Sequence, residues 1–345
     1  MNRPPRVSVL LMYFSKLLGF IGSLFACVAC GWMAWTLAAQ PGVAELAGQQ
    51  KDWLLLGAAS GVAAGGQLLF YSRWHWLLRL VGIPVGWLRA TAASAVAELL
   101  SFAAVGAAGG DLYRGVAVGR AAEGHRVGLV TAILADRVAG VYALFCLAAI
   151  AGQLCRGSES HWSSVLAASL PVLWLAVAGG GLVILLGLFV NLGPLLAVTR
   201  RWPLVNKALT PVLASIERFR SRPWAFGVAV LWGITVHALN ATVLWLIARG
   251  LSLPHPSWGQ HCVIMSLGTS TGILPLPMAG LGAVELVIEQ LYQAAVPDAK
   301  AAGLIAALGH RVLSMSVIAA LAAGLSLLAR SQVTATAVQP ADIQS

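Results

Sequence analysis

Residues 127–151 read VGLVTAILADRVAGVYALFCLAAIA. This stretch contains two charges, Asp136 and Arg137, side by side in a predominantly apolar run. A run of about 20 apolar residues is long enough to cross the hydrocarbon core of a bilayer as a helix. An ionisable residue inside such a helix is costly and marks a functional position by default. The stretch therefore predicts a membrane-spanning helix with charged residues at mid-depth.

The composition of the whole chain gives the same result. Of the 345 residues, 59% are hydrophobic and 10% are charged, with a mean hydropathy of +0.83, whereas about 25% of the residues of a soluble domain are charged. An ordinary soluble enzyme is thereby excluded, and apolar residues in long blocks argue against a membrane β-barrel. We predict an all-α polytopic membrane protein with a single transmembrane domain over 1–330 and a polar, disordered tail over 331–345.

Eight hydrophobic segments divide this domain. Two of them, within 90–121 and 260–295, are interrupted by Gly and Pro, which break helices, and we predict that each is a re-entrant helical hairpin. The predicted breaks are Gly109, Gly110, Pro275, Pro277, Gly280 and Gly282. The other six are predicted spanning helices, at about 17–39, 53–70, 127–151, 165–192, 224–248 and 301–329.

The formal net charge of +10 is explained by the loops. With two hairpins, sixteen of the 22 Lys and Arg lie on the side of both termini and four on the other side; the loops of the first group include Arg73 and Arg114. Basic residues mark cytoplasmic loops, so both termini are expected in the cytoplasm, and no nucleic-acid partner is implied. Eight full spans would also place both termini inside, but they would move Arg114, Arg120 and Arg126 outside and lower the asymmetry.

The two broken segments match each other as a repeat, with cores at about 90–151 and 260–329. Asp111 precedes Arg137 by the same separation along the chain as Glu285 precedes Arg311, and the two pairs are offset by 174. Asp111 follows Gly109-Gly110 and resembles a helix N-cap. Ten residues of helix outward and ten back, each about 15 Å, would bring the acid and the Arg of each repeat to one depth. The first hairpin would enter from inside and the second from outside, as in the inverted repeats of transporters.

The paired charges have two interpretations. They are either ion pairs that only staple the hairpins, or the site that binds a substrate. Helix N-termini attract anions, and Arg binds phosphate bidentately, so an anionic head group fits the second interpretation. His237 and His310 are either proton relays or hydrogen-bonded packing residues. The candidate substrate-binding residues are Arg137, Arg311, Asp111, Glu285, Arg114, Asp136, Glu98, His237 and His310.

Motifs of cofactor and metal chemistry are missing from the sequence. There is no zinc motif, Walker loop, nucleophile elbow or nucleotide fingerprint, and the five cysteines form no framework. We therefore predict no cofactor, no metal and no enzymatic activity. An intramembrane transferase is the weaker alternative, because no nucleophile–base set is visible.

Two motifs carry a family resemblance. Residues 109–120, GGDLYRGVAVGR, and 134–140, LADRVAG, resemble one signature of the transmembrane region of lysylphosphatidylglycerol synthases, in Asp111, Arg114, Asp136, Arg137 and Gly140. Residues 274–285, LPLPMAGLGAVE, resemble the second signature. The family also includes stand-alone flippase-like membrane proteins. No aminoacyl-transferase domain is expected within these 345 residues, so lysyl transfer is not implied. The Pro that commonly precedes GGD in the family is missing here.

The resemblance implies a membrane domain that moves a lipid head group across the bilayer. The expected function is translocation of an anionic phospholipid or a polyprenyl-phosphate-linked lipid, with membrane lipids as partners. The expected location is the cell membrane, the inner one in a Gram-negative source. The alternative is a non-transporting partner that scaffolds a lipid or glycan biosynthetic enzyme. A second copy of the chain is the other candidate partner.

Overall fold

The structure is a computed structural model. It describes Trp35 and residues 49–338, with gaps at 104–106, 120, 123–124, 158–159, 191–201, most of 203–215, 218, 272–281, 298 and 300. Within these residues every regular element is an α-helix. The helices are α3 (Trp53–Leu80), α4 (Trp87–Ala103), α5 (Ala107–Val118), α6 (Arg126–Leu154), α7 (Ser160–Phe189), α10 (Pro223–Gly250), α11 (Trp258–Ser270), α12 (Ala283–Ala295) and α13 (Ala302–Val338).

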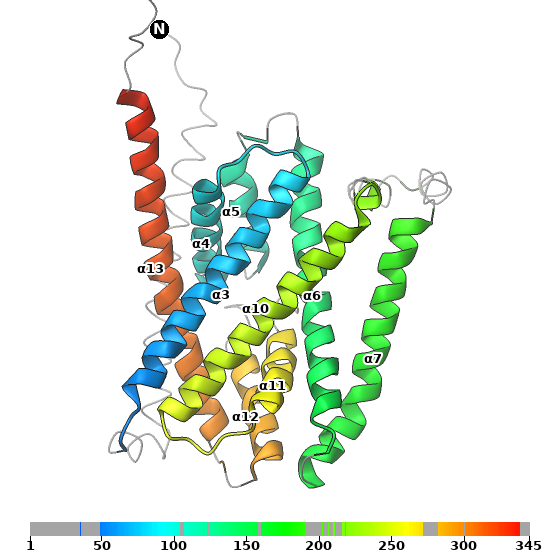
Figure 1. Cartoon of the computed structure of the whole chain (residues 1–345), viewed down its shortest axis with the longest axis vertical. Coiled ribbons are helices and arrows are strands. Elements are labelled where there is room, and N and C mark those ends of the chain that lie inside the picture. The colour runs from blue at the N-terminus through cyan, green and yellow to red at the C-terminus, as the bar shows by residue number, and fades with distance from the viewer. Residues whose placement is uncertain are drawn as a thin grey trace, which may run out of the picture.

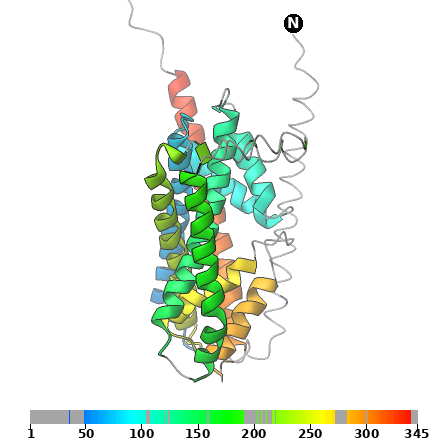
Figure 2. The same cartoon turned by 90° about the vertical axis from the view of Figure 1, so that its right-hand side faces the viewer.

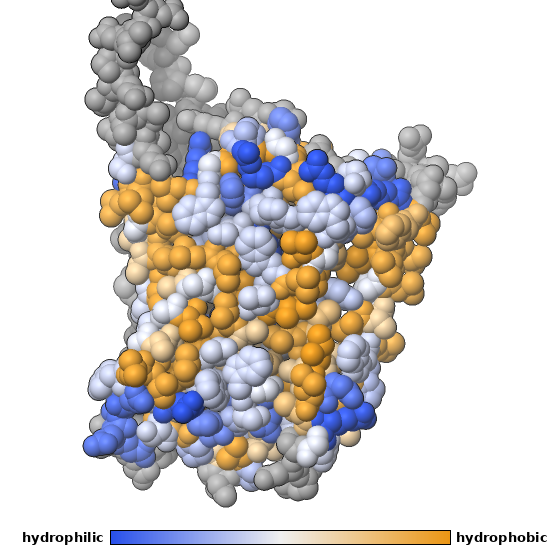
Figure 3. Space-filling model, in the orientation of Figure 1, coloured by the Kyte–Doolittle hydropathy of each residue, from blue (hydrophilic) through white to orange (hydrophobic). Residues whose placement is uncertain are grey.

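Five of the described helices are long and apolar enough to cross a membrane, namely α3, α6, α7, α10 and α13. An apolar band runs across the middle of the surface between two polar ends (Figure 3). The chain is therefore an all-α, multi-pass membrane protein, as predicted. Of the span predicted at 17–39, the structure describes Trp35 alone.

The remaining four helices form two short hairpins. α4 and α5 lie at the end of the bundle where α3 finishes, and α11 and α12 lie at the opposite end, next to the finish of α10 (Figure 1). A view turned by 90° places both hairpins on the same side of the bundle, one in each half (Figure 2). α11 and α12 have 13 residues each, or about 20 Å, which is too short for a hydrocarbon core of about 30 Å.

The second hairpin is held by local polar bonds at its membrane-surface end. Ser257 and Gln260 form a capping box at the start of α11, since the Ser257 hydroxyl accepts from the Gln260 N–H and the Gln260 side chain accepts from the Ser257 N–H. Glu289 of α12 accepts hydrogen bonds from the backbone N–H of Ala301 and Leu304, at 2.8 and 2.7 Å. A residue of α12 thereby satisfies donors at the first turn of α13.

The span predicted at 53–70 is ten residues too short, because α3 continues to Leu80. After Phe70 the first Gly or Pro is Gly82, which has a φ of +84°, and Pro84 follows. Arg73, which we predicted in the following loop, is consequently inside the span and is 3% exposed. Arg114 was also counted with the loops and is likewise 3% exposed, on α5.

Gly109 and Gly110 are not a hairpin break, and Asp111 is not an N-cap. All three residues lie inside α5, which begins at Ala107. Gly110 serves packing instead: a Cβ built there would overlap the Ser101 hydroxyl and lie 2.6 Å from the Ala97 carbonyl oxygen. The missing side chain lets α5 approach α4 closely.

The break of the second hairpin is described only at its last residue. Gly282 precedes α12 with a φ of +89°, a conformation that glycine adopts without strain. Pro275, Pro277 and Gly280 lie outside the described residues.

The C-terminal stretch differs from the prediction in its first residues. α13 ends at Val338, so residues 331–338 are helical where we predicted a disordered tail. Neither Gly nor Pro occurs between Arg330 and Val338, so nothing in this sequence interrupts the helix. Residues 339–345 lie outside the described part of the chain.

The close contact at Gly110 predicts a large cost for a small side chain. We expect Gly110→Ala to lower the free energy of unfolding by about 1–3 kcal/mol, as overpacking does, because one neighbour is the Ala97 backbone. Gly115→Ala on the same helix is the matched control, since its Cβ would meet only Leu129, at 4.0 Å. Thermal unfolding in detergent measures both; equal melting temperatures for the two variants would contradict the packing role.

The hairpin architecture predicts which loops share a side of the membrane. Single cysteines replacing Gly86, before α4, and His125, after α5, should react with an impermeant thiol reagent from one side. A cysteine replacing Gly157, between α6 and α7, should react from the other side. All three positions are exposed. Labelling of the Gly86 and His125 positions from opposite sides would instead favour eight full spans.

Candidate functional site

Three described helices contribute charged side chains to one cluster, on the side of α6 that faces α3 and α5. Asp136 of α6 lies between two arginines. Its Oδ1 accepts from the Nε of Arg73 at 2.9 Å, and its Oδ2 accepts from the Nη1 of Arg114 at 3.3 Å. All three residues are 3% exposed. A carboxylate shared by two guanidinium groups leaves this buried group with an excess of one positive charge.

Aromatic rings support the two arginines. The Phe70 ring lies 5.5 Å from the guanidinium carbon of Arg73 and 5.0 Å from that of Arg114. The Trp74 ring lies 5.5 Å from the guanidinium carbon of Arg114. Contacts of a cation with an aromatic face are favourable, and more so without water. They fix the direction of both side chains beside Asp136.

The pair predicted between Asp111 and Arg137 is present beside this group. The Nε and Nη2 of Arg137 donate to the two carboxylate oxygens of Asp111, at 2.8 and 2.7 Å. The pair is bidentate, the strongest geometry for an Arg–carboxylate contact. The Arg137 side chain is nevertheless 41% exposed, and that of Asp111 is 20% exposed, so the pair is open on one side.

The second predicted pair joins Glu285 of α12 to Arg311 of α13. Arg311 Nε donates to one carboxylate oxygen of Glu285, and the other oxygen accepts from the Gly282 N–H at 2.7 Å. The side chains are 3% and 9% exposed. This pair is closed where the first is open, although acid and arginine are 26 residues apart in both pairs.

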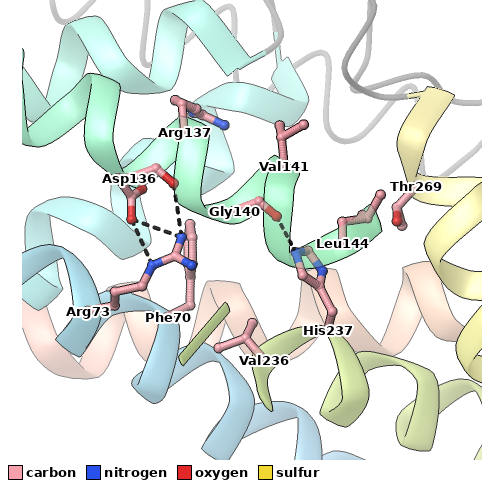
Figure 4. A pocket seen from close by; sticks show the side chains of 10 residues that line it. All are labelled: Phe70, Arg73, Asp136, Arg137, Gly140, Val141, Leu144, Val236, His237 and Thr269. Atoms are coloured by element: carbon pink, nitrogen blue, oxygen red, sulfur yellow. Dashed lines mark hydrogen bonds and ion pairs between the residues drawn. The ribbon is translucent and has the colours of Figure 1, made fainter. Parts of the chain in front are cut away.

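Each pair lies beside a cavity. The first cavity, of about 400 Å³, is lined by Arg73, Asp136 and Arg137 with His237 (Figure 4). The second, of about 210 Å³, is lined by Glu285 and Arg311. Thr269, near the inner end of α11, lines both cavities. The two cavities are therefore neighbours at mid-depth.

The other predicted residues occupy three different settings. His237 Nε2 is 3.0 Å from the Gly140 carbonyl oxygen, which ties α10 to α6 at the first cavity. His310 lines the second cavity, and its Nε2 has no hydrogen-bond partner among the described residues. Glu98 of α4 accepts from the Tyr71 hydroxyl, at 2.7 Å, and from the Gln67 amide, at 3.3 Å.

Arg73 is the member of the cluster that the sequence prediction missed. The signal was present in the aromatic residues around it, since Tyr71, Trp74 and Trp76 extend the apolar pattern past residue 70. Trp and Tyr are also typical of membrane–water interfaces, so the sequence prediction placed this segment at the membrane surface. Among the described residues no group of three or more His, Cys, Asp and Glu could hold a metal ion.

Comparison with protein families tests the resemblance seen in the two motifs. A family model described as the lysylphosphatidylglycerol synthase TM region matches residues 19–322. The chain therefore belongs to this family, whose membrane proteins are related to lipid synthesis or translocation. No match was found among curated proteins or among solved structures.

The difference in burial between the two pairs predicts a difference in stability. Glu285→Gln keeps an acceptor for the Gly282 N–H but leaves Arg311 uncompensated, which costs about 3–5 kcal/mol for a buried pair. Asp111→Asn should cost less, because the exposed side of Arg137 can be solvated from the cavity. Denaturant unfolding of the purified variants measures both; a larger loss for Asp111→Asn would contradict this ranking.

Proposed function

We propose that the protein translocates an anionic lipid across the membrane by binding its phosphate-bearing head group in the two central cavities. The observation that carries this proposal is the Arg137 side chain, which is held bidentately by Asp111 and yet is 41% exposed beside a cavity of about 400 Å³. The substrate class is an anionic phospholipid or a polyprenyl-phosphate-linked lipid.

The chemistry of the first cavity favours a phosphate over a neutral head group. The Asp111 carboxylate accepts two parallel hydrogen bonds from Arg137, and phosphate oxygens accept the same fork geometry. A phosphate can therefore replace Asp111 as the acceptor of both hydrogen bonds that Arg137 donates. Arg73 lines the same cavity and adds positive potential.

The arrangement of the two hairpins supports passage rather than binding alone. The first hairpin lies in one half of the bundle and the second in the other (Figure 2), and each brings an acid to an arginine. We interpret them as an inverted repeat, with a substrate site at its centre. Thr269 adjoins both cavities, so a head group released from Arg137 has a short route to Arg311.

Orientation follows from the basic residues at the two ends. Arg79, Arg89 and Arg330 lie at the end that holds α4 and α5, and Lys51, Arg156 and Arg249 lie at the other end. Arg220 and Arg222, which precede α10, also lie at the first end, so this end has more of the described basic residues than the other. We infer that this end faces the cytoplasm, in the cell membrane, and that both termini lie there.

The second candidate function is a non-transporting membrane partner of a lipid or glycan biosynthetic enzyme. The closed Glu285–Arg311 pair favours it, because that pair resembles a structural staple. Catalysis by this chain itself is not part of our proposal.

Lipid movement in proteoliposomes tests the translocator. The purified chain is placed in phosphatidylcholine vesicles that contain tail-labelled phosphatidylglycerol or a labelled polyprenyl phosphate, and loss of signal to an impermeant quencher is followed. We expect Arg137→Ala to slow movement at least tenfold, because the fork that binds phosphate is lost. Arg137→Lys should be intermediate, since Lys keeps the charge alone.

Arg249→Ala is the matched control. Arg249 is an exposed arginine that stacks on Trp245 at 4.7 Å, far from the cavities along α10, and its loss should leave movement unchanged. If the wild-type chain moves neither lipid faster than empty vesicles do, the translocator is wrong. If a charge swap of Asp111 and Arg137 restores full movement, the pair is only a staple.

A further inference from the structure

Glu98 differs from the other acids that the structure describes inside the membrane. Its carboxylate accepts from the Tyr71 hydroxyl and the Gln67 amide, both of which are neutral and belong to α3. Asp111, Asp136 and Glu285 each have an arginine within 3.3 Å. A carboxylate with neutral partners in a low-dielectric setting is the one that takes up a proton most readily.

Glu289 shows that an acid can be held here without an arginine. It accepts from two backbone N–H groups at the start of α13 and from the Gln293 amide. The positive end of a helix stabilises its charge. Glu98 has no such support: it lies in the interior of α4, whose first and last residues are Trp87 and Ala103.

Among the residues that the structure describes, the charges in the part of the bundle around Glu98 balance only while Glu98 is ionised. Arg73, Arg114 and Arg137 contribute three positive charges, and Asp111 and Asp136 contribute two negative charges. Tyr71, which donates to Glu98, is next to Phe70, whose ring contacts the guanidinium groups of Arg73 and Arg114. The cluster is neutral with Glu98 ionised and has a net charge of +1 with Glu98 protonated.

The groups around Glu98 can be named for each packed helix. α3 presents Gln67 and Tyr71. α5 packs on α4 at Gly110, and its ionisable residues are Asp111, Tyr113 and Arg114. α13 packs on the neighbouring part of α4 with apolar side chains, including Ala322 and Leu325. The ionisable residues of α13 at mid-depth, His310 and Arg311, line the second cavity together with Phe102, one turn beyond Glu98.

We propose that Glu98 is a proton-binding site coupled to the head-group site, so that one proton is taken up when one anionic head group binds. This inference rests on the proposed function. A phosphodiester carries one negative charge, which matches the net charge of the cluster when Glu98 is protonated. An isolated net charge at mid-depth is costly, so the proton and the anion each favour the binding of the other. Such coupling is reciprocal.

The coupling predicts the direction of a pH effect. Protonation of Glu98 is needed for tight binding of the anion, so the affinity for phosphatidylglycerol should fall as the pH rises, by up to about tenfold per pH unit for one coupled proton. Glu98→Gln imitates the protonated acid and keeps acceptor and amide groups for Tyr71 and Gln67. We expect it to bind phosphatidylglycerol tightly at every pH.

Proton uptake measures the coupling directly. The full chain in detergent and weak buffer is mixed with phosphatidylglycerol, and a pH indicator reports the protons removed from solution. The wild type should take up close to one proton per bound lipid at the midpoint of its pH dependence, and Glu98→Gln should take up none. Glu217→Gln is the matched control, because Glu217 is 71% exposed and pairs with Arg220 at the surface.

Two results would overturn the proposal. One is an unchanged pH dependence of binding in Glu98→Gln. The other is a pH dependence of binding that is lost in His237→Gln but kept in Glu98→Gln, since His237 also lines the first cavity.

Infrared difference spectra of the lipid-free chain separate this proposal from the proposed function. A protonated-carboxyl band that appears on acidification and is missing in Glu98→Gln would show the proton site even if no lipid bound. Absence of that difference would overturn the site, whatever lipid the chain moves.

Discussion

A charge at the centre of a bilayer needs a partner, and this constraint determines how the first hairpin is attached. α5 carries Asp111 and Arg114, which pair with Arg137 and Asp136 on α6. Arg73 adds α3 through the same Asp136. Three helices are thereby joined at one depth by polar contacts, and the shape of the first cavity follows from these contacts.

The sequence predicted the two acid–arginine pairs because their spacing is a property of the chain. An equal separation between acid and arginine in the two repeats can be read without knowing how helices pack. The roles of Gly110 and Arg73 could not be predicted from spacing, because they depend on how the helices pack against one another. Gly110 allows contact with α4, and the buried Arg73 of α3 donates to Asp136 of α6. The substrate-binding role of the predicted residues stays a prediction.

The two halves use the same pair of residue types differently. In the first half the arginine is partly exposed beside the larger of the two cavities, which Arg73 also lines. In the second half the acid also accepts from the start of its own helix, and both partners are buried. Two acid–arginine pairs with the same spacing along the chain therefore differ in exposure, one being open and the other closed.

The contact of Glu289 with the first turn of α13 has a mechanical consequence. Together with the Glu285–Arg311 pair, it ties α12 to α13 at two levels, one near the membrane surface and one at mid-depth. Polar contacts at two points along α12 and α13 prevent these helices from tilting apart. α12 and α13 thus act as a single rigid wall, and any widening of the route between the cavities must come from displacement of the elements opposite them.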